Sequence, residues 1–298
     1  MPQRPITSLA PVDLLRTLAP QAAGRSDPTM RLAAGEVMLA LRLPTGPATV
    51  RIGGAGRDLT AEAWGPGAGE ALERAPGIVG AADDPSGFAP TGRPLDEWAR
   101  RYPGLRITRS GLIVHRLVKA TVEQKVTGKE AKASYRRMAL AIGEPAPGPG
   151  DLVLPPDPER LAGMAYHRFH PFGIERKRAE TLIRLGRHHR RLDEAAALPL
   201  DDAYRRIRAV RGVGPWTAAF AGMAALGDPD AVPVGDDNLP NTVAWLLAGE
   251  PRADDGRMLE LLEPYRGHRS RVLQLVKAAG RKAPRFGPRR QLRDIDRI

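Results

Sequence analysis

Val210-Arg211-Gly212-Val213-Gly214-Pro215-Trp216-Thr217-Ala218 decides the fold, and Gly235-Asp236-Asp237-Asn238 follows it after a short interval. Apolar side chains recur at helical spacing on both sides of the glycines, at Leu200, Tyr204, Ile207 and Val210 before them and at Trp216, Phe220, Met223 and Leu226 after them. This spacing predicts two short amphipathic helices joined by a tight turn.

The two glycines suit a backbone that must come close to another molecule. Gly212 and Gly214 give the turn conformational freedom, and Pro215 fits the first turn of the second helix, where no N–H partner is lost. A phosphate could then meet the unpaired N–H groups of Gly214, Trp216 and Thr217 at the positive end of that helix. An ordinary turn in which the glycines only end a helix is the alternative.

These residues resemble the helix-hairpin-helix DNA glycosylase superfamily, and most closely its DNA-3-methyladenine glycosylase II family. The resemblance is carried by residues 211–218, 234–239 and 173–179, and more weakly by residues 122–128. It spans residues 13 to 280 approximately. The hairpin followed by the aspartates is the specific part of the match.

The resemblance implies an α+β fold with three parts. Residues 1–88 are expected to form a small N-terminal domain with a sheet and helices, residues 89–280 an all-α helix-hairpin-helix glycosylase core, and residues 281–298 a basic tail. The pattern of the residues agrees, because it predicts strands over 37–43 and 49–52 and a helix over 61–74 before a mainly helical remainder. A Pro- and Gly-rich loop is expected over 144–150.

The second acid of the pair, Asp237, corresponds to the family's catalytic aspartate. Cleavage of a base from deoxyribose passes through a sugar with oxocarbenium character, and a fixed carboxylate stabilises that positive charge. Either acid could instead cap the helix that is expected from residue 239 onward. We assign capping to Asp236 and catalysis to Asp237, and the reverse assignment stays open.

Some members of the superfamily also cleave the strand with a lysine that follows the hairpin, and this chain has Trp216 there. The resemblance therefore implies a monofunctional glycosylase that leaves an abasic site and has no lyase activity. The expected base-pocket residues are Trp216, Tyr166 and Asp236. Packing of Trp216 in the core is an equal alternative, because Phe220 and Met223 lie at helical spacing from it.

Two positions depart from the family pattern. Where the family inserts an apolar wedge into the gap left by the flipped base, the chain has Lys125 after Gln124. The alternatives are that a neighbour, Val126 or Gln124, is the wedge, or that extrusion favours bases that are already loosely paired. Where aromatic residues wall the base pocket near the end of the last helix, it has Lys277. A lysine is a poor host for a cationic alkylated base, because like charges repel.

The charge distribution favours a DNA partner. The net charge is +12, and residues 1–90 carry 8 Lys and Arg against 9 Asp and Glu, so the excess lies in the part with the hairpin. Basic residues are densest over residues 266–297. The expected DNA-binding residues are Gly212, Gly214, Trp216, Thr217, Gln124, Lys125, Arg269 and Arg271, and the expected partner is double-stranded DNA with damaged bases.

The absence of cysteine excludes an iron–sulfur cluster and a zinc finger. The resemblance leaves one possible ion, a Na⁺ or K⁺ held by main-chain carbonyls of Arg208, Val210 and Val213; no other cofactor is expected. No targeting segment or membrane span is evident. We expect a cytoplasmic monomer, associated with the nucleoid if the source is bacterial.

Three functions are compatible with the sequence. The first is a hydrolytic glycosylase for damaged bases of the alkylated, 3-methyladenine type, acting in base excision repair. The second is the same fold with a deaminated or oxidised purine as its lesion, which Lys125 and Lys277 favour. The third is a non-catalytic DNA-binding protein, against which Asp237 argues, since a carboxylate facing a polyanion does not help binding.

Overall fold

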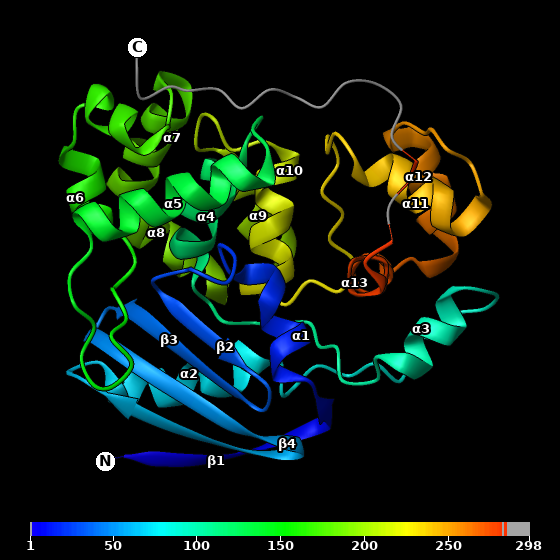
Figure 1. The fold of residues 1–298 in the computed structure, drawn as a ribbon, viewed down its shortest axis with the longest axis horizontal. Coiled ribbons are helices and arrows are strands. Elements are labelled where there is room, and N and C mark those ends of the chain that lie inside the picture. The colour runs from blue at the N-terminus through cyan, green and yellow to red at the C-terminus, as the bar shows by residue number, and fades with distance from the viewer. Residues whose placement is uncertain (1, 282, 285–298) are drawn as a thin grey trace.

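The structure of the protein, a computed structural model, describes residues 2–281 and 283–284. Its N-terminal part is one antiparallel sheet with strand order β1-β4-β3-β2 (Figure 1). A helix, α2, covers this sheet and shares an apolar core with it. The elements are β1 (Gln3–Val12), α1 (Leu14–Leu18), η1 (Ala19–Gln21), β2 (Met30–Ala33), β3 (Glu36–Leu43), β4 (Gly46–Trp64) and α2 (Ala68–Val79).

The helix predicted over 61–74 is wrong at both ends. Residues 61–64 complete β4, and the turn after them, with Gly65 at φ +98°, separates the strand from α2. The helix then continues through Pro76 to Val79. Pro76 has no N–H for the carbonyl of Leu72, and the Arg4 side chain approaches that oxygen to 3.5 Å instead.

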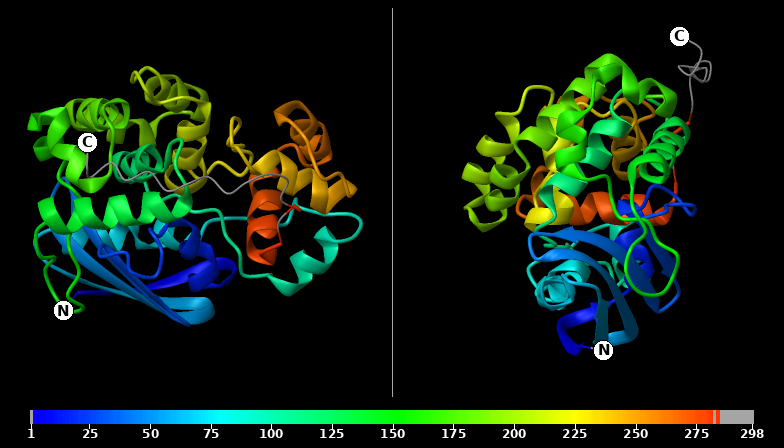
Figure 2. Two further views of the ribbon diagram at one scale, coloured as in Figure 1. Left: turned by 45° about the horizontal axis from the view of Figure 1, so that its top comes forward. Right: turned by 90° about the vertical axis from the view of Figure 1, so that its left-hand side faces the viewer.

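The rest of the chain is helical, and its helices lie together on one side of the sheet (Figure 2). They bury two separate cores. One gathers α4, α5, α7, α9 and α10, and the other gathers α3, α11, α12 and α13. The helices are α3 (Leu95–Arg101), α4 (Ile113–Glu123), α5 (Gly128–Ile142), α6 (Pro158–Gly163), η2 (Tyr166–Phe172), α7 (Arg176–Arg187), α8 (His189–Asp193), η3 (Glu194–Ala197), α9 (Leu200–Arg208), α10 (Pro215–Ala221), η4 (Gly222–Leu226), α11 (Leu239–Ala248), α12 (Asp255–Leu262), η5 (Glu263–Tyr265) and α13 (Arg269–Ala279).

The predicted α+β class is therefore confirmed, and the helical part is more divided than the sequence indicated. We call the helices of the first core the hairpin lobe and those of the second core the α13 lobe. Helix α3 joins the α13 lobe although it precedes the whole hairpin lobe in the chain. Within the described part of the chain, no helix has both the length and the apolar character needed to cross a membrane.

Two contacts attach the hairpin lobe to the sheet. The loop after α5 reaches down to β3, where Leu152 and Leu154 are buried against Met38 and Ala40 (Figure 1). On the other side, Asp27 and Lys119 form an ion pair of 2.9 Å between the loop before β2 and α4. Both of these side chains are almost completely buried.

Replacing Lys119 by Met should lower the free energy of unfolding by about 3–5 kcal/mol, because Asp27 would stay buried without its cation. Urea unfolding of the two proteins measures the loss. The double variant Lys119→Met/Asp27→Asn is the control, since the neutral amide would need no counter-charge, and it should recover much of the loss. Equal stability of the wild type and the single variant would contradict the assignment.

Asp193 gives the fold a pH dependence. Burial raises the pKa of its carboxyl to about 6. The hydrogen bond that Oδ1 accepts from the N–H of Val114 acts in the opposite direction and lowers the pKa. Between about pH 4 and pH 6 the folded protein keeps a proton that the unfolded chain releases, so this group makes folding less favourable as the pH rises. Asp193→Asn should thus stabilise the protein by about 1–3 kcal/mol at pH 7 and have little effect at pH 4. An equal effect at both pH values would exclude this origin.

Candidate active site

The hairpin is formed as the glycine spacing predicts. Helix α9 ends at Arg208, the N–H of Val213 donates to the carbonyl of Val210 over 2.9 Å, and α10 begins at Pro215. Gly212 has φ +99°, and a Cβ there would lie 2.1 Å from Oγ1 of Thr181, so only glycine fits.

The backbone does not require glycine at position 214, which corrects the expectation that both glycines supply conformational freedom. The φ of Gly214 is −89°, and a Cβ there would meet no atom within 4 Å. The fold would accept a side chain at this position. Gly214 therefore leaves open the approach to the first N–H groups of α10 from outside the protein.

The end of α4 is fastened to the hairpin by Gln124. Its Nε2 donates to the carbonyl of Gly212 over 3.0 Å and to Oγ1 of Thr217 over 2.7 Å. The Thr217 side chain is buried, so only its backbone N–H remains for the predicted DNA contact. Gln124 is a positioning residue that joins the loop after α4 to the hairpin.

Lys125 stands at the tip of that loop. It is exposed and has φ +56°, a backbone conformation that favours glycine and is unusual for lysine. The loop is held from behind by the buried Arg178, whose Nη1 donates over 2.7 Å to the carbonyl of Val122 in the last turn of α4. Lys125, at the position where the family has its wedge, is thus exposed on a loop that follows a hydrogen-bonded end of α4.

The acidic pair lies at the start of α11. Oδ1 of Asp236 accepts from the N–H groups of Asn238 and Leu239, each over 2.9 Å, and its Oδ2 accepts from Nε1 of Trp216 over 2.9 Å. Asp236 makes the capping bonds expected of it. Asp237, the next residue, is exposed to solvent at the entrance of the same helix.

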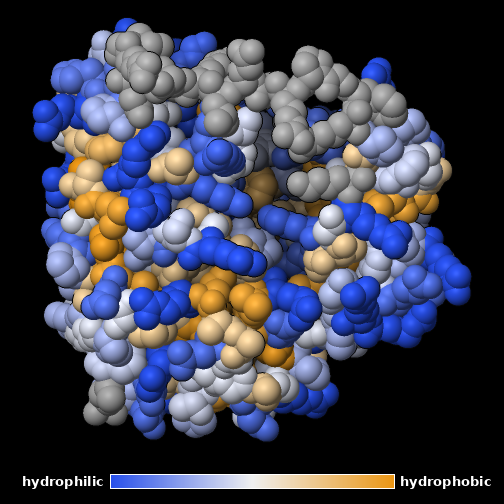
Figure 3. Space-filling view, viewed as in Figure 1, coloured by the Kyte–Doolittle hydropathy of each residue, from blue (hydrophilic) through white to orange (hydrophobic). Residues whose placement is uncertain are grey.

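Trp216 connects Asp236 with Phe220 and Arg116 through successive side-chain contacts. Its ring packs against Phe220 with the ring centroids 4.7 Å apart, and Cζ of Arg116 lies 5.1 Å from the centroid of Phe220. Trp216 is half-buried, so it is neither a core residue nor a free surface residue. The space-filling view shows a recess between the two helical lobes, bordered by hydrophilic residues (Figure 3).

Sequence reasoning missed Arg116. It lies on α4 among buried apolar neighbours and is itself 6% exposed. Desolvation by burial lowers the pKa of its guanidinium. The only signal in the sequence is an arginine on the apolar face of a helix, which by itself predicts no partner.

No protein-family model matches the chain. The 3-methyladenine DNA-glycosylase from Archaeoglobus fulgidus superposes with a TM-score of 0.77 at 16% identity, over 92% of this chain and 97% of that one. The chain has the helix-hairpin-helix DNA glycosylase fold. The predicted resemblance is thus confirmed in the fold, including the small N-terminal sheet.

Two curated relatives match part of the sequence. A putative DNA-3-methyladenine glycosylase of Bacillus subtilis is 26% identical over 164 residues, which are 53% of this chain and 56% of the relative. A probable bifunctional transcriptional activator/DNA repair enzyme of Mycobacterium tuberculosis is 32% identical over 139 residues, which are 46% of this chain and 28% of the relative. The matches therefore span about half of the first relative's length and less of the second's.

Arg269 and Arg271, which the sequence predicted to bind DNA, each bind a carboxylate within the protein. Both nitrogens of the buried Arg271 fork bind the Asp83 carboxylate, over 2.7 and 2.6 Å, and Nη2 also donates to the carbonyl of Asp84. Arg269 is paired with both carboxylate oxygens of Asp230. The two guanidinium groups hold the α13 lobe together and onto the rest of the protein.

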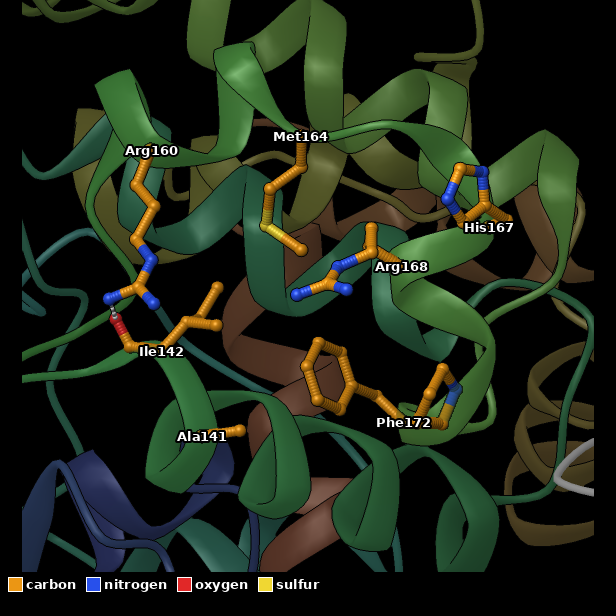
Figure 4. Close-up of a pocket in the computed structure, with 8 residues that line it drawn as sticks. Ala141, Ile142, Arg160, Met164, His167, Arg168 and Phe172 are labelled. Atoms are coloured by element: carbon orange, nitrogen blue, oxygen red, sulfur yellow. Dashed lines mark hydrogen bonds between the residues drawn. The ribbon is translucent and has the colours of Figure 1, made fainter.

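Tyr166, which was expected in the base pocket, contacts the rings of His167 and His170. It lies on η2, which packs against α5 and α7, and its ring faces Arg176 at 4.8 Å. Beside it, α5, α6 and η2 enclose a mainly apolar cavity of about 600 Å³ (Figure 4). Neither the hairpin nor the acidic pair contributes to its lining: Ala141, Ile142, Arg160, Met164, His167, Arg168, Pro171 and Phe172.

Two other predicted features have no test in the structure. Most of the basic tail, residue 282 and residues 285–298, lies outside the described residues. The described part of the chain holds no group of three or more His, Asp or Glu side chains suited to a metal ion. The cation expected at the hairpin would be held by main-chain oxygens instead, so this observation does not bear on it.

The two glycines of the hairpin make a matched test. Gly212→Ala should lower the free energy of unfolding by about 1–3 kcal/mol, through the positive φ and the clash with Thr181. Gly214→Ala should change it by less than about 0.5 kcal/mol but weaken duplex binding, because the methyl group would stand where a phosphate approaches. Chemical unfolding and a DNA titration check both, and unchanged binding by a well-folded Gly214→Ala protein would refute the phosphate contact.

Proposed function

We propose that the protein is a monofunctional DNA glycosylase that removes damaged bases, with alkylated purines of the 3-methyladenine type as the reference substrates, from duplex DNA. The observation that carries the proposal is the difference between the two acids, since one is held by hydrogen bonds within the protein and the other is exposed. Asp236 is hydrogen-bonded to the start of α11 and to Trp216, and Asp237, the next residue, is exposed. The names of both curated relatives support the same function.

DNA would bind across the hairpin. In this proposal a phosphate would meet the N–H groups of Gly214, Trp216 and Thr217 at the start of α10, where the helix dipole favours an anion. Such contacts fix the position of the duplex without reading its sequence. Lys125 would stand over the gap left by the extruded nucleotide.

The chemistry then needs little from the protein beyond electrostatics. As the bond from C1′ to the base breaks, positive charge grows on the sugar, and the Asp237 carboxylate stabilises it and orients the attacking water. The base leaves with the bonding electron pair, and the water supplies the hydroxyl of the abasic sugar. Because Trp216 occupies the position after the hairpin, no amine is available there to attack the sugar, and the strand stays intact.

A Na⁺ or K⁺ ion fits the turn, since carbonyl oxygens are suitable ligands for a hard cation. The carbonyls of Arg208, Val210 and Val213 would hold it, and that of Val210 keeps a second lone pair beside its bond to the N–H of Val213. Such an ion would add positive charge next to the phosphate. We further propose that the active form is a monomer and that it works in the cytoplasm, at the nucleoid if the source is bacterial.

Asp237→Asn should reduce base release by roughly 100- to 1,000-fold, because it removes the charge that stabilises the sugar cation, while duplex binding stays intact. Methylated duplex DNA is incubated with each protein, and the released bases are identified by mass spectrometry. Asp236→Asn is the matched neighbour, which should instead lower thermal stability. Tight binding without release of any base by the wild type would identify a DNA-binding protein on a glycosylase fold.

A further inference from the structure

The cavity between α5, α6 and η2 has apolar walls that are fixed by the fold. Met164 and Phe172 line it and also pack against the core of the hairpin lobe, and Ile142, in the last turn of α5, is buried. Nη1 of Arg160 donates over 3.2 Å to the carbonyl of Ile142 and ties α6 to the end of α5. The cavity is therefore formed by the protein alone and does not need a ligand to shape it.

The charged side chains of this cavity are all basic. Arg160, His167 and Arg168 line it, and none of its eight lining residues is acidic. The guanidinium of Arg168 points toward the middle of the cavity, in the region bordered by Met164 and Phe172 (Figure 4). Within the described part of the chain, the Arg168 side chain makes no hydrogen bond and no ion pair.

The acids that lie near these cations in the sequence have other partners. Glu159, the residue before Arg160, pairs with Arg190 over 3.1 Å. Glu144, just after α5, pairs with Arg42 of β3 over 3.0 Å. The positive charge at the cavity is thus left for an anion that comes from outside the protein.

We propose that the cavity binds a small organic acid, whose carboxylate meets Arg168 while its apolar chain or ring lies against Met164 and Phe172. A volume of about 600 Å³ is within the usual range of small-molecule sites, which are mostly apolar and carry a few polar groups that fix the orientation of the ligand. The planar guanidinium fork matches a carboxylate. An inorganic anion would leave the apolar walls in water, and an apolar alcohol would leave the cation unpaired.

This site is separate from the proposed catalytic centre. The hairpin and the acidic pair contribute none of its lining residues, which come from α5, α6, η2 and the residue after α6. Binding of the acid therefore does not depend on the glycosylase function proposed above.

Calorimetric titration of the full chain with 4-phenylbutyrate tests the site. The neutral 4-phenylbutanol and the cationic 4-phenylbutylamine are matched ligands with the same ring and chain. Arg168→Met removes the cation and keeps the length of the side chain, and Ala141→Trp fills the cavity from an exposed position on α5. The control is Arg57→Met, which removes an exposed arginine of β4 that does not line the cavity. Thermal unfolding is recorded for each protein.

The wild type should bind 4-phenylbutyrate, and the alcohol and the amine should bind roughly tenfold more weakly or worse, because they lose the charge-assisted hydrogen bonds to Arg168. Arg168→Met should weaken binding of the acid to the same extent, Ala141→Trp should abolish it, and Arg57→Met should leave it unchanged.

Three results would overturn the inference. The first is equal affinity for the acid and the alcohol, which would show that the cation does not select the ligand. The second is an equal loss in Arg57→Met and Arg168→Met, which would indicate a general attraction of anions to a basic protein. The third is no binding of the acid at millimolar concentration, and a short peptide with leucine beside aspartate that bound in its place would point to a protein partner.

Discussion

The carboxylate of Asp236 is the contact on which the site depends. It caps α11 with one oxygen and receives the indole N–H of Trp216 with the other, so one residue of the α13 lobe is fixed against the hairpin lobe. Asp237 follows this fixed residue directly in the chain. The backbone position of Asp237, the proposed catalytic group, therefore follows from its neighbour, and the residue is exposed.

The hairpin itself is fixed in a comparable way. Gly212 lies against Thr181 of α7, and Gln124 binds both the hairpin carbonyl of Gly212 and the side chain of Thr217. The loop with Lys125 and the hairpin turn are thus joined, because the Gln124 side chain between them binds the hairpin.

Much of this could be predicted from the sequence where one local pattern determines the outcome. The glycine spacing and the following acids predicted the hairpin, the α+β class and the capping role of Asp236. The sequence does not show bonds to a distant partner: a cluster of arginines indicates charge, but only the fold shows that Arg271 binds Asp83, 188 positions away. Arg116 is the opposite case, since the sequence cannot show that a charged side chain has been buried with no partner.

The ion pair between Arg271 and Asp83 also holds α13 against the N-terminal part of the protein. Asp83 follows the last helix of the sheet domain, and Gln274 on the same α13 binds the carbonyl of Arg106 in the segment between the lobes. These bonds attach α13 to the end of the N-terminal sheet domain and to the segment between α3 and α4. If DNA binds as we propose, these contacts would keep the α13 lobe in place while the duplex bends, and base steps that bend easily would lower the cost of that bending.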